Sequence, residues 1–134
     1  SNNSTLKGAQ GAYGCTSPGV GPANGGKGGA GLVIICKFLK FDGQINLSGQ
    51  NGEDASGHYD GYNPSQATFR GGSGGGGGGS IIINTEDVIS SLGSIIISGG
   101  VGGGAGSMNV MNYGMNSGSA GNGGDGFILW IGDQ

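Results

Sequence analysis

Charged residues and the usual catalytic side chains are scarce in this chain of 134 residues. Lys and Arg together number 5, Asp and Glu number 8, and the single histidine is His58. The formal net charge is −3 and no basic stripe is present to neutralise phosphates, so we expect no nucleic-acid partner. The carboxylates near His58, at Glu53, Asp54 and Asp60, are interpreted as a solvated polar loop. Their spacing matches no catalytic triad or metal motif, which predicts a protein that is not an enzyme and binds no cofactor or metal.

Long hydrophobic runs are also absent. No apolar block exceeds five residues, whereas about 20 are needed to cross a bilayer, so we expect no membrane insertion. No stretch combines a helical apolar period with capping residues, which predicts almost no α-helix. The two cysteines, Cys15 and Cys36, allow one disulfide or two separate thiols. The chain begins at Ser1 without a signal peptide, as expected of a processed product or a fragment of a longer polypeptide.

Glycine is the residue in excess, with 37 copies against a usual share of about 7%. No Gly-X-Y register persists, which excludes collagen, and a free glycine run is usually a flexible linker. Four apolar blocks argue for a folded core instead, at residues 32–35, 81–83, 95–97 and 127–131. Their β-branched and aromatic residues predict strands, and their continuous pattern predicts burial on both faces.

An internal repeat organises the chain. Its unit is a glycine run, an apolar strand, a polar connection, a glycine, a second strand and Ser-Gly. On this basis a single domain, residues 1–134, divides into repeat 1 at about 24–52, a loop at 53–70, repeat 2 at about 71–106, a loop at 107–118 and a truncated repeat 3 at about 119–134. Gly, Asn and Pro punctuate both loops, which predicts irregular structure there. Asp87 and Asp125 are expected to form turns.

Two architectures explain how the glycine runs become ordered. In the first, the runs are polyglycine II helices, which lack internal hydrogen bonds and side chains, pack side by side and bond to one another laterally, with short β-strands flanking the bundle. In the second, a short β-solenoid, each repeat is one coil and the glycines make its corners. Both architectures predict an all-β or irregular fold, and the sequence leaves the choice open.

The repeats resemble glycine-rich domains of bacteriophage tail and fibre proteins. The resemblance rests on GGKGGAGLVII at 25–35, GQINLSG at 43–49, GGGGGGSIII at 74–83 and SIIISG at 94–99, and it covers about residues 25–131. The architecture is similar to that of the distal tail-fibre adhesins of T-even-like phages. The resemblance implies packed polyglycine II helices whose connecting loops contact a bacterial surface receptor. It also implies an extracellular or virion-surface location, with other fibre or virion proteins as partners.

The two loops supply the candidate binding residues. These are His58, Tyr59, Asp60, Tyr62, Phe69 and Arg70 in the first loop, and Met108, Met111, Tyr113 and Met115 in the second. Tyr and Arg are favoured at binding hot spots, and Met adapts to irregular partners. In the alternative interpretation, Phe69 and the tyrosines cover the ends of the glycine bundle, and the methionines form a satellite core or a subunit interface.

Two functions fit these observations. The first is a non-enzymatic phage tail-fibre or adhesin domain that binds a host-surface receptor, a protein or a glycan, through loops carried on a glycine-rich scaffold. The alternative is a self-assembling extracellular filament or coat subunit. In that case the apolar residues 127–131 would pair with neighbouring copies of the chain.

Overall fold

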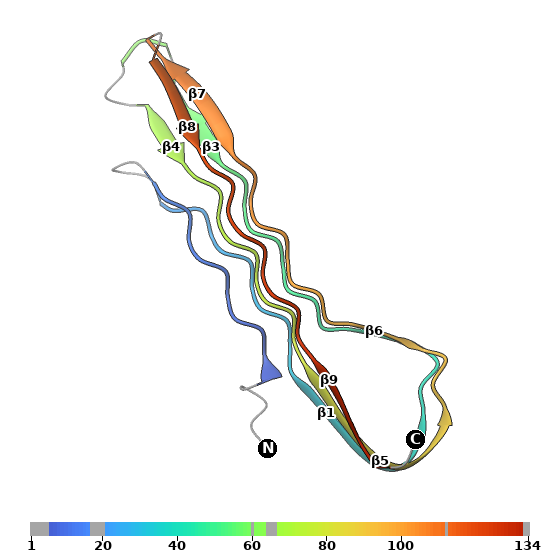
Figure 1. The fold of residues 1–134 in the computed structure, drawn as a ribbon. Coiled ribbons are helices and arrows are strands. Elements are labelled where there is room, and N and C mark those ends of the chain that lie inside the picture. The colour runs from blue at the N-terminus through green and yellow to red at the C-terminus, as the bar shows by residue number, and fades with distance from the viewer. Residues whose placement is uncertain (1–5, 17–20, 60, 64–66, 112, 133–134) are drawn as a thin grey trace.

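The computed structural model describes residues 6–16, 21–59, 61–63, 67–111 and 113–132 (Figure 1). Strand covers 38% and helix 1% of it, so the fold is all-β and irregular, as predicted. The strands are β1 (Leu32–Lys40), β2 (Gln44–Asn46), β3 (Ser56–His58), β4 (Thr68–Arg70), β5 (Ile81–Ser90), β6 (Ser94–Ile96), β7 (Gly106–Val110), β8 (Tyr113–Ser117) and β9 (Ile128–Ile131).

Glycine-rich passes run along the middle of the elongated molecule and connect strands at its two ends (Figure 1). We name the described passes in chain order: pass A (6–15), pass B (23–31), pass C (47–55), pass D (71–80), pass E (97–105) and pass F (120–127). Strands β3, β4, β7 and β8 lie at one end, which we call the loop end. Strands β1, β2, β5, β6 and β9 lie at the other, the sheet end.

Pass D is central, and its hydrogen bonds repeat every three residues. The N–H groups of Gly74 and Gly77 donate to carbonyls of pass A, and those of Gly76 and Gly79 donate to pass C. The N–H of Gly78 donates to pass F. A period of three residues is that of polyglycine II, whereas a β-strand has a period of two. The glycine runs are therefore packed helices of the polyglycine II type with flanking strands.

The described passes form three layers. Passes B, D and F run parallel to one another in the middle layer, and passes C and E form a second layer that runs the opposite way. Pass A bonds to passes B and D, whereas passes C and E bond to the middle layer from its other side. Consecutive passes thus reverse direction, which separates this architecture from a β-solenoid, whose coils stack in one direction.

Five passes surround pass D, and no described pass lies on the side between passes A and F, which we call the open side. Passes A, C and F accept hydrogen bonds from pass D, while passes B and E donate to it. Pass B uses the carbonyls of Gly74 and Gly77, and pass E uses those of Ser73 and Gly76. By the same period the remaining carbonyls, at residues 72, 75 and 78, face the open side. No described residue donates a backbone hydrogen bond to them.

The close approach of the passes requires glycine at their contacts. A Cβ built on Gly78 would lie 1.7 Å from the carbonyl oxygen of Ile97, and one on Gly28 would lie 1.7 Å from that of Gly8. Because the obstructing atoms are backbone on both sides, neither pass could move away without breaking its lateral hydrogen bonds. The absence of a side chain is therefore what allows the layers to form.

Side-chain oxygens complete the hydrogen bonding of pass E. Asn51 and Asp54 of pass C accept N–H groups of pass E at 2.8 and 2.7 Å, and Asn122 and Asp125 of pass F accept others at 2.9 Å. Each pair is spaced by the three residues of one helical turn. Asp125 is thus a cross-pass acceptor and Asp87 lies within β5, so the prediction that both form turns was wrong.

The hydrophobic core lies at the sheet end. Strands β1, β5 and β9 form a parallel sheet in the order β1-β5-β9, which continues the middle layer, and the parallel pair β2–β6 continues passes C and E. Ile81 and Ile83 are 0% and 1% exposed and cluster with Leu39 and Leu47. Trp130 of β9 packs against this cluster from its edge.

The outer face of the β1-β5-β9 sheet is exposed, which corrects the expectation that the apolar blocks are buried on both faces. Ile35 is 77% exposed, and Leu129 and Ile131 are each 45% exposed. The described part of pass A begins at Leu6, whose carbonyl accepts the N–H of Ser80 at 2.8 Å, one residue before β5 begins. The described part of pass A therefore lies over the glycine passes and not over the sheet that continues them.

Candidate functional site

The two segments that interrupt the repeats both project at the loop end (Figure 1). They are more regular than the sequence predicted, because β3 pairs antiparallel with β4 and β7 pairs antiparallel with β8. Some of the Gly and Asn residues that suggested irregular loops lie inside these pairs, with Gly57 opposite Phe69 and Asn109 opposite Gly114. Antiparallel pairing therefore holds both segments upright at the end of the passes.

Phe69 and Met108 bring the two segments together over Gly57. A Cβ on Gly57 would lie 2.7 Å from Cδ2 of Phe69 and 2.9 Å from Sδ of Met108. The ring comes from β4 and the thioether from β7, so the first and second predicted binding segments share this contact. Both side chains therefore pack over the same glycine, and a Met side chain adapts to irregular shapes. The loop end is thus one packed unit.

The remaining predicted binding residues lie around this unit. His58 is exposed at the end of β3, Tyr59 is half-buried and Tyr62 is 91% exposed. Met111 is 62% exposed and has a φ of 47°, a left-handed conformation typical of tight hairpin turns. The backbones of Tyr113 and Met115 pair with Val110 and Met108 in the β7–β8 hairpin. Asp60 lies outside the described residues.

Arg70 is held at the base of the β3–β4 pair. Its Nε donates to Ser56 Oγ at 2.8 Å, and its Nη1 lies 3.7 Å from Glu53 Oε2. The same Glu53 oxygen accepts the backbone N–H of Asn24 at 2.9 Å. That backbone hydrogen bond lowers the pKa of Glu53 most, with further lowering from the Asn24 side chain and the Arg70 charge. These contacts tie passes B and C to strand β4 below the loop end.

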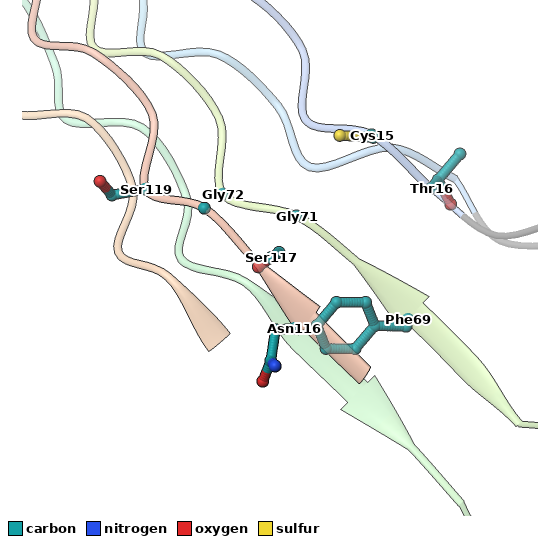
Figure 2. A pocket seen from close by; sticks show the side chains of 9 residues that line it. Cys15, Thr16, Phe69, Gly71, Gly72, Asn116, Ser117 and Ser119 are labelled. Atoms are coloured by element: carbon teal, nitrogen blue, oxygen red, sulfur yellow. The ribbon is translucent and has the colours of Figure 1, made fainter. Parts of the chain in front are cut away.

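A pocket of about 570 Å³ opens at the loop end of the gap between passes A and F (Figure 2). Figure 2 shows the Phe69 ring near Asn116 and Ser117, with Cys15 and Thr16 across the Gly71–Gly72 backbone. The lining residues are Cys15, Thr16, Phe69, Gly71, Gly72, Asn116, Ser117, Gly118 and Ser119. The pocket therefore occupies the open side of pass D, where the carbonyl of Gly72 faces outward.

A second, smaller hollow of about 310 Å³ lies on the flank of the passes. It is lined by Gln10, Asn24, Gly25, Gly26, Lys27, Gln50, Asn51 and Glu53. Two of these side chains are engaged in the scaffold, since Glu53 accepts from Asn24 and Asn51 accepts from Val101. The hollow is polar, and its Glu53 and Asn51 side chains already form hydrogen bonds that hold the passes together.

Most residues of the larger pocket were not singled out from the sequence. Only Phe69 was among the predicted binding residues, whereas Cys15, Asn116, Ser117 and Ser119 were not. Cys15 at the end of pass A and Cys36 in β1 are both free thiols in this structure. The sequence alone gives no signal for this site, because its residues are far apart in the chain. The end of pass A meets the segment leading into pass F only once the passes have stacked around pass D.

Among the described residues, no three His, Cys, Asp or Glu side chains come together as metal ligands. In the same part of the chain, no helix is long and apolar enough to span a membrane. Comparison of the chain with protein families, with curated proteins and with solved structures gave no match in any of the three.

Proposed function

We propose that the chain is a non-enzymatic adhesin domain of the phage tail-fibre type, which binds a bacterial surface receptor through its loop end. The observation that carries the proposal is the shared contact of Phe69 and Met108 over Gly57, which unites both interrupting segments on one end of the scaffold. Exposed Tyr62 and Met111 surround this unit. Aromatic and Met side chains on a supported surface are typical of protein and glycan recognition.

The scaffold supports this role physically. A bundle of passes tied by lateral backbone hydrogen bonds keeps the loop end in a fixed geometry, so little ordering entropy is lost on binding. The side chains at the loop end contribute little to the core, which lies at the sheet end around Ile81 and Ile83. Recognition residues can therefore change without loss of the fold.

Cell binding by a matched pair of variants tests the proposal. Tyr62 is 91% exposed at the loop end and Leu92 is 88% exposed at the sheet end, and the melting temperature of each variant checks that the fold is kept. Labelled wild-type protein is incubated with a panel of bacterial strains, and a bound strain is then tested with each variant. Tyr62→Ala combined with Met111→Ala should lower binding at least about tenfold, whereas Leu92→Ala should leave it unchanged. An equal loss of cell binding in the double variant and in Leu92→Ala, or a loss in neither, would reject the adhesin function.

A second function, a self-assembling filament or coat subunit, is favoured by one specific observation. Strand β9 is an edge of the β1-β5-β9 sheet, contains no charged residue, and leaves Leu129 and Ile131 each 45% exposed. An uncharged apolar edge strand is a template for pairing with another chain, here a second copy. Electron microscopy of the purified protein distinguishes the two functions, because ordered polymers that Leu129→Lys abolishes support assembly and discrete particles support the adhesin.

A further inference from the structure

The pocket at the loop end has features of a site for one class of ligand. We propose that it binds an uncharged saccharide, which lies against pass D in the gap between passes A and F. This inference rests on the proposed adhesin function and names the chemistry of its receptor. The volume of the pocket, about 570 Å³, falls inside the range of small-molecule sites, roughly 300–1,000 Å³.

The floor of the pocket favours a ligand with several hydrogen-bond donors. Passes B and E use two of the three sets of carbonyls on pass D, and the third set, which includes Gly72, faces this side without a backbone donor among the described residues. A carbonyl that faces a pocket is an acceptor only, so it selects a donor. Saccharide hydroxyl groups supply donors at close intervals along a ring.

The walls of the pocket favour a neutral ligand with an apolar face. None of the described lining residues is charged, which leaves an anionic or cationic group without a partner in the pocket. Asn116, Ser117 and Ser119 supply amide and hydroxyl groups that both donate and accept. Phe69 supplies an aromatic ring, whose electron-rich face attracts the polarised C–H groups of a sugar ring.

Two glycines lining the pocket are not required by the scaffold. A Cβ on Gly71 would meet only ordinary contacts, at 3.4 Å from Cys15 Sγ and 3.6 Å from Ser117 Cβ, and a Cβ on Gly118 would meet nothing within 4 Å. This contrasts with Gly78, where a Cβ would lie 1.7 Å from a backbone oxygen. A side chain at residue 71 would lie between the lining residues Cys15 and Ser117, and one at residue 118 would extend from the pocket lining into open space, so neither would disturb the passes.

The experiment uses one substitution at two open positions. Gly118→Leu places a large side chain at the lining of the pocket, whereas Gly43→Leu places the same side chain at the sheet end, and a Cβ at either position meets nothing within 4 Å. Binding is measured on an array of neutral, sialylated and sulfated oligosaccharides. Wild type and Gly43→Leu should bind neutral members, and Gly118→Leu should bind them at least about tenfold more weakly at unchanged melting temperature. Binding of charged members alone, of no member, or equally by Gly118→Leu would overturn the proposal.

The thiol of Cys15 gives a second readout inside the same pocket. A bound neutral oligosaccharide should slow the reaction of Cys15 with a maleimide and leave the reaction of Cys36, at the sheet end, unchanged. Periodate, which destroys sugars, should abolish binding of the wild type to cells, whereas protease treatment of the cells should not. If protease alone abolishes cell binding, the adhesin function stands and the saccharide inference falls. If neither treatment nor any loop-end variant changes cell binding, the adhesin function falls as well.

Discussion

Ser73 Oγ accepts the backbone N–H of Glu53 at 2.7 Å, across the boundary between pass D and pass C. The same hydroxyl donates to the carbonyl of Asn24, so one side chain links three passes. Ser73 is 0% exposed and stands within a run that is otherwise glycine from residue 71 to residue 79. A buried hydroxyl that satisfies two backbone groups contributes more than an exposed one.

Ser73→Ala should therefore destabilise the protein. The substitution leaves the N–H of Glu53 and the carbonyl of Asn24 without this partner, and a buried polar group left in that state costs about 1–3 kcal/mol. Ser98→Ala is the matched control, since Ser98 is exposed on pass E, and it should change the free energy of unfolding by less than about 0.5 kcal/mol. Urea denaturation of both variants measures the difference. Equal midpoints for the two would show that the Ser73 hydroxyl is not important for stability.

Alanine at two glycines should have opposite effects. A Cβ on Gly78 would overlap the Ile97 carbonyl, whereas one on Gly124 would meet nothing within 4 Å. Gly78→Ala should cost more than about 4 kcal/mol or prevent folding, because a fixed backbone blocks its side chain. Gly124→Ala should be neutral or stabilise by about 0.4–1 kcal/mol, since it restricts only the unfolded chain. Thermal unfolding of both variants tests this, and a well-folded Gly78→Ala would contradict the packing described.

Amide hydrogen exchange should follow the three-residue period. In pass F the N–H groups of Gly123 and Gly126 donate to pass E at 2.9 and 2.8 Å, whereas those of Gly121 and Gly124 donate to no described residue. The first pair should exchange slowly and the second pair close to the rate of a free peptide. Exchange followed by NMR gives the pattern directly. Exchange rates that alternate every two residues would indicate a β-strand, and uniformly fast exchange would indicate a flexible linker.

Acid should weaken the contacts that the Glu53 carboxylate makes with Asn24 and Arg70. Its pKa is lowered below the ordinary 4.5, chiefly by the backbone hydrogen bond from Asn24, so the ionised form is favoured in the folded state. Its contribution is complete above the unfolded pKa and is lost as the pH falls through the lower folded pKa. Glu53→Gln should therefore show a smaller loss of stability than wild type between about pH 6 and about pH 3. Parallel pH profiles for the two proteins would assign the acid sensitivity to other groups.

Much of the scaffold could be predicted from the apolar blocks and the glycine runs. The β-branched residues at 32–35 and 81–83 lie in strands, and residues 71–79 lie in a polyglycine II-type pass. The exposed outer face of the sheet could not be predicted. It depends on which layers pack against the sheet, and nothing in the strand residues encodes the number of layers above them.

The candidate site was predictable by segment but not by residue. Gly, Asn and Pro marked the interruptions at 53–70 and 107–118, yet the pairing of Gly57 with Phe69 arises from tertiary context. Cys15 and Asn116 are distant in sequence and meet only at the pocket. The side-chain acceptors Asn122 and Asp125 carried a usable signal, since their three-residue spacing is that of the helix itself.

The division between glycine passes and a small core sets the thermal behaviour of the molecule. Unfolding the passes hydrates amide groups far more than hydrocarbon, and amide hydration lowers the heat capacity that hydrocarbon hydration raises. The heat-capacity increment per residue should therefore fall below the usual value of about 12–15 cal/mol/K, as calorimetry would measure. A smaller increment flattens the curve of stability against temperature, so the protein should resist denaturation in the cold as well as in the heat.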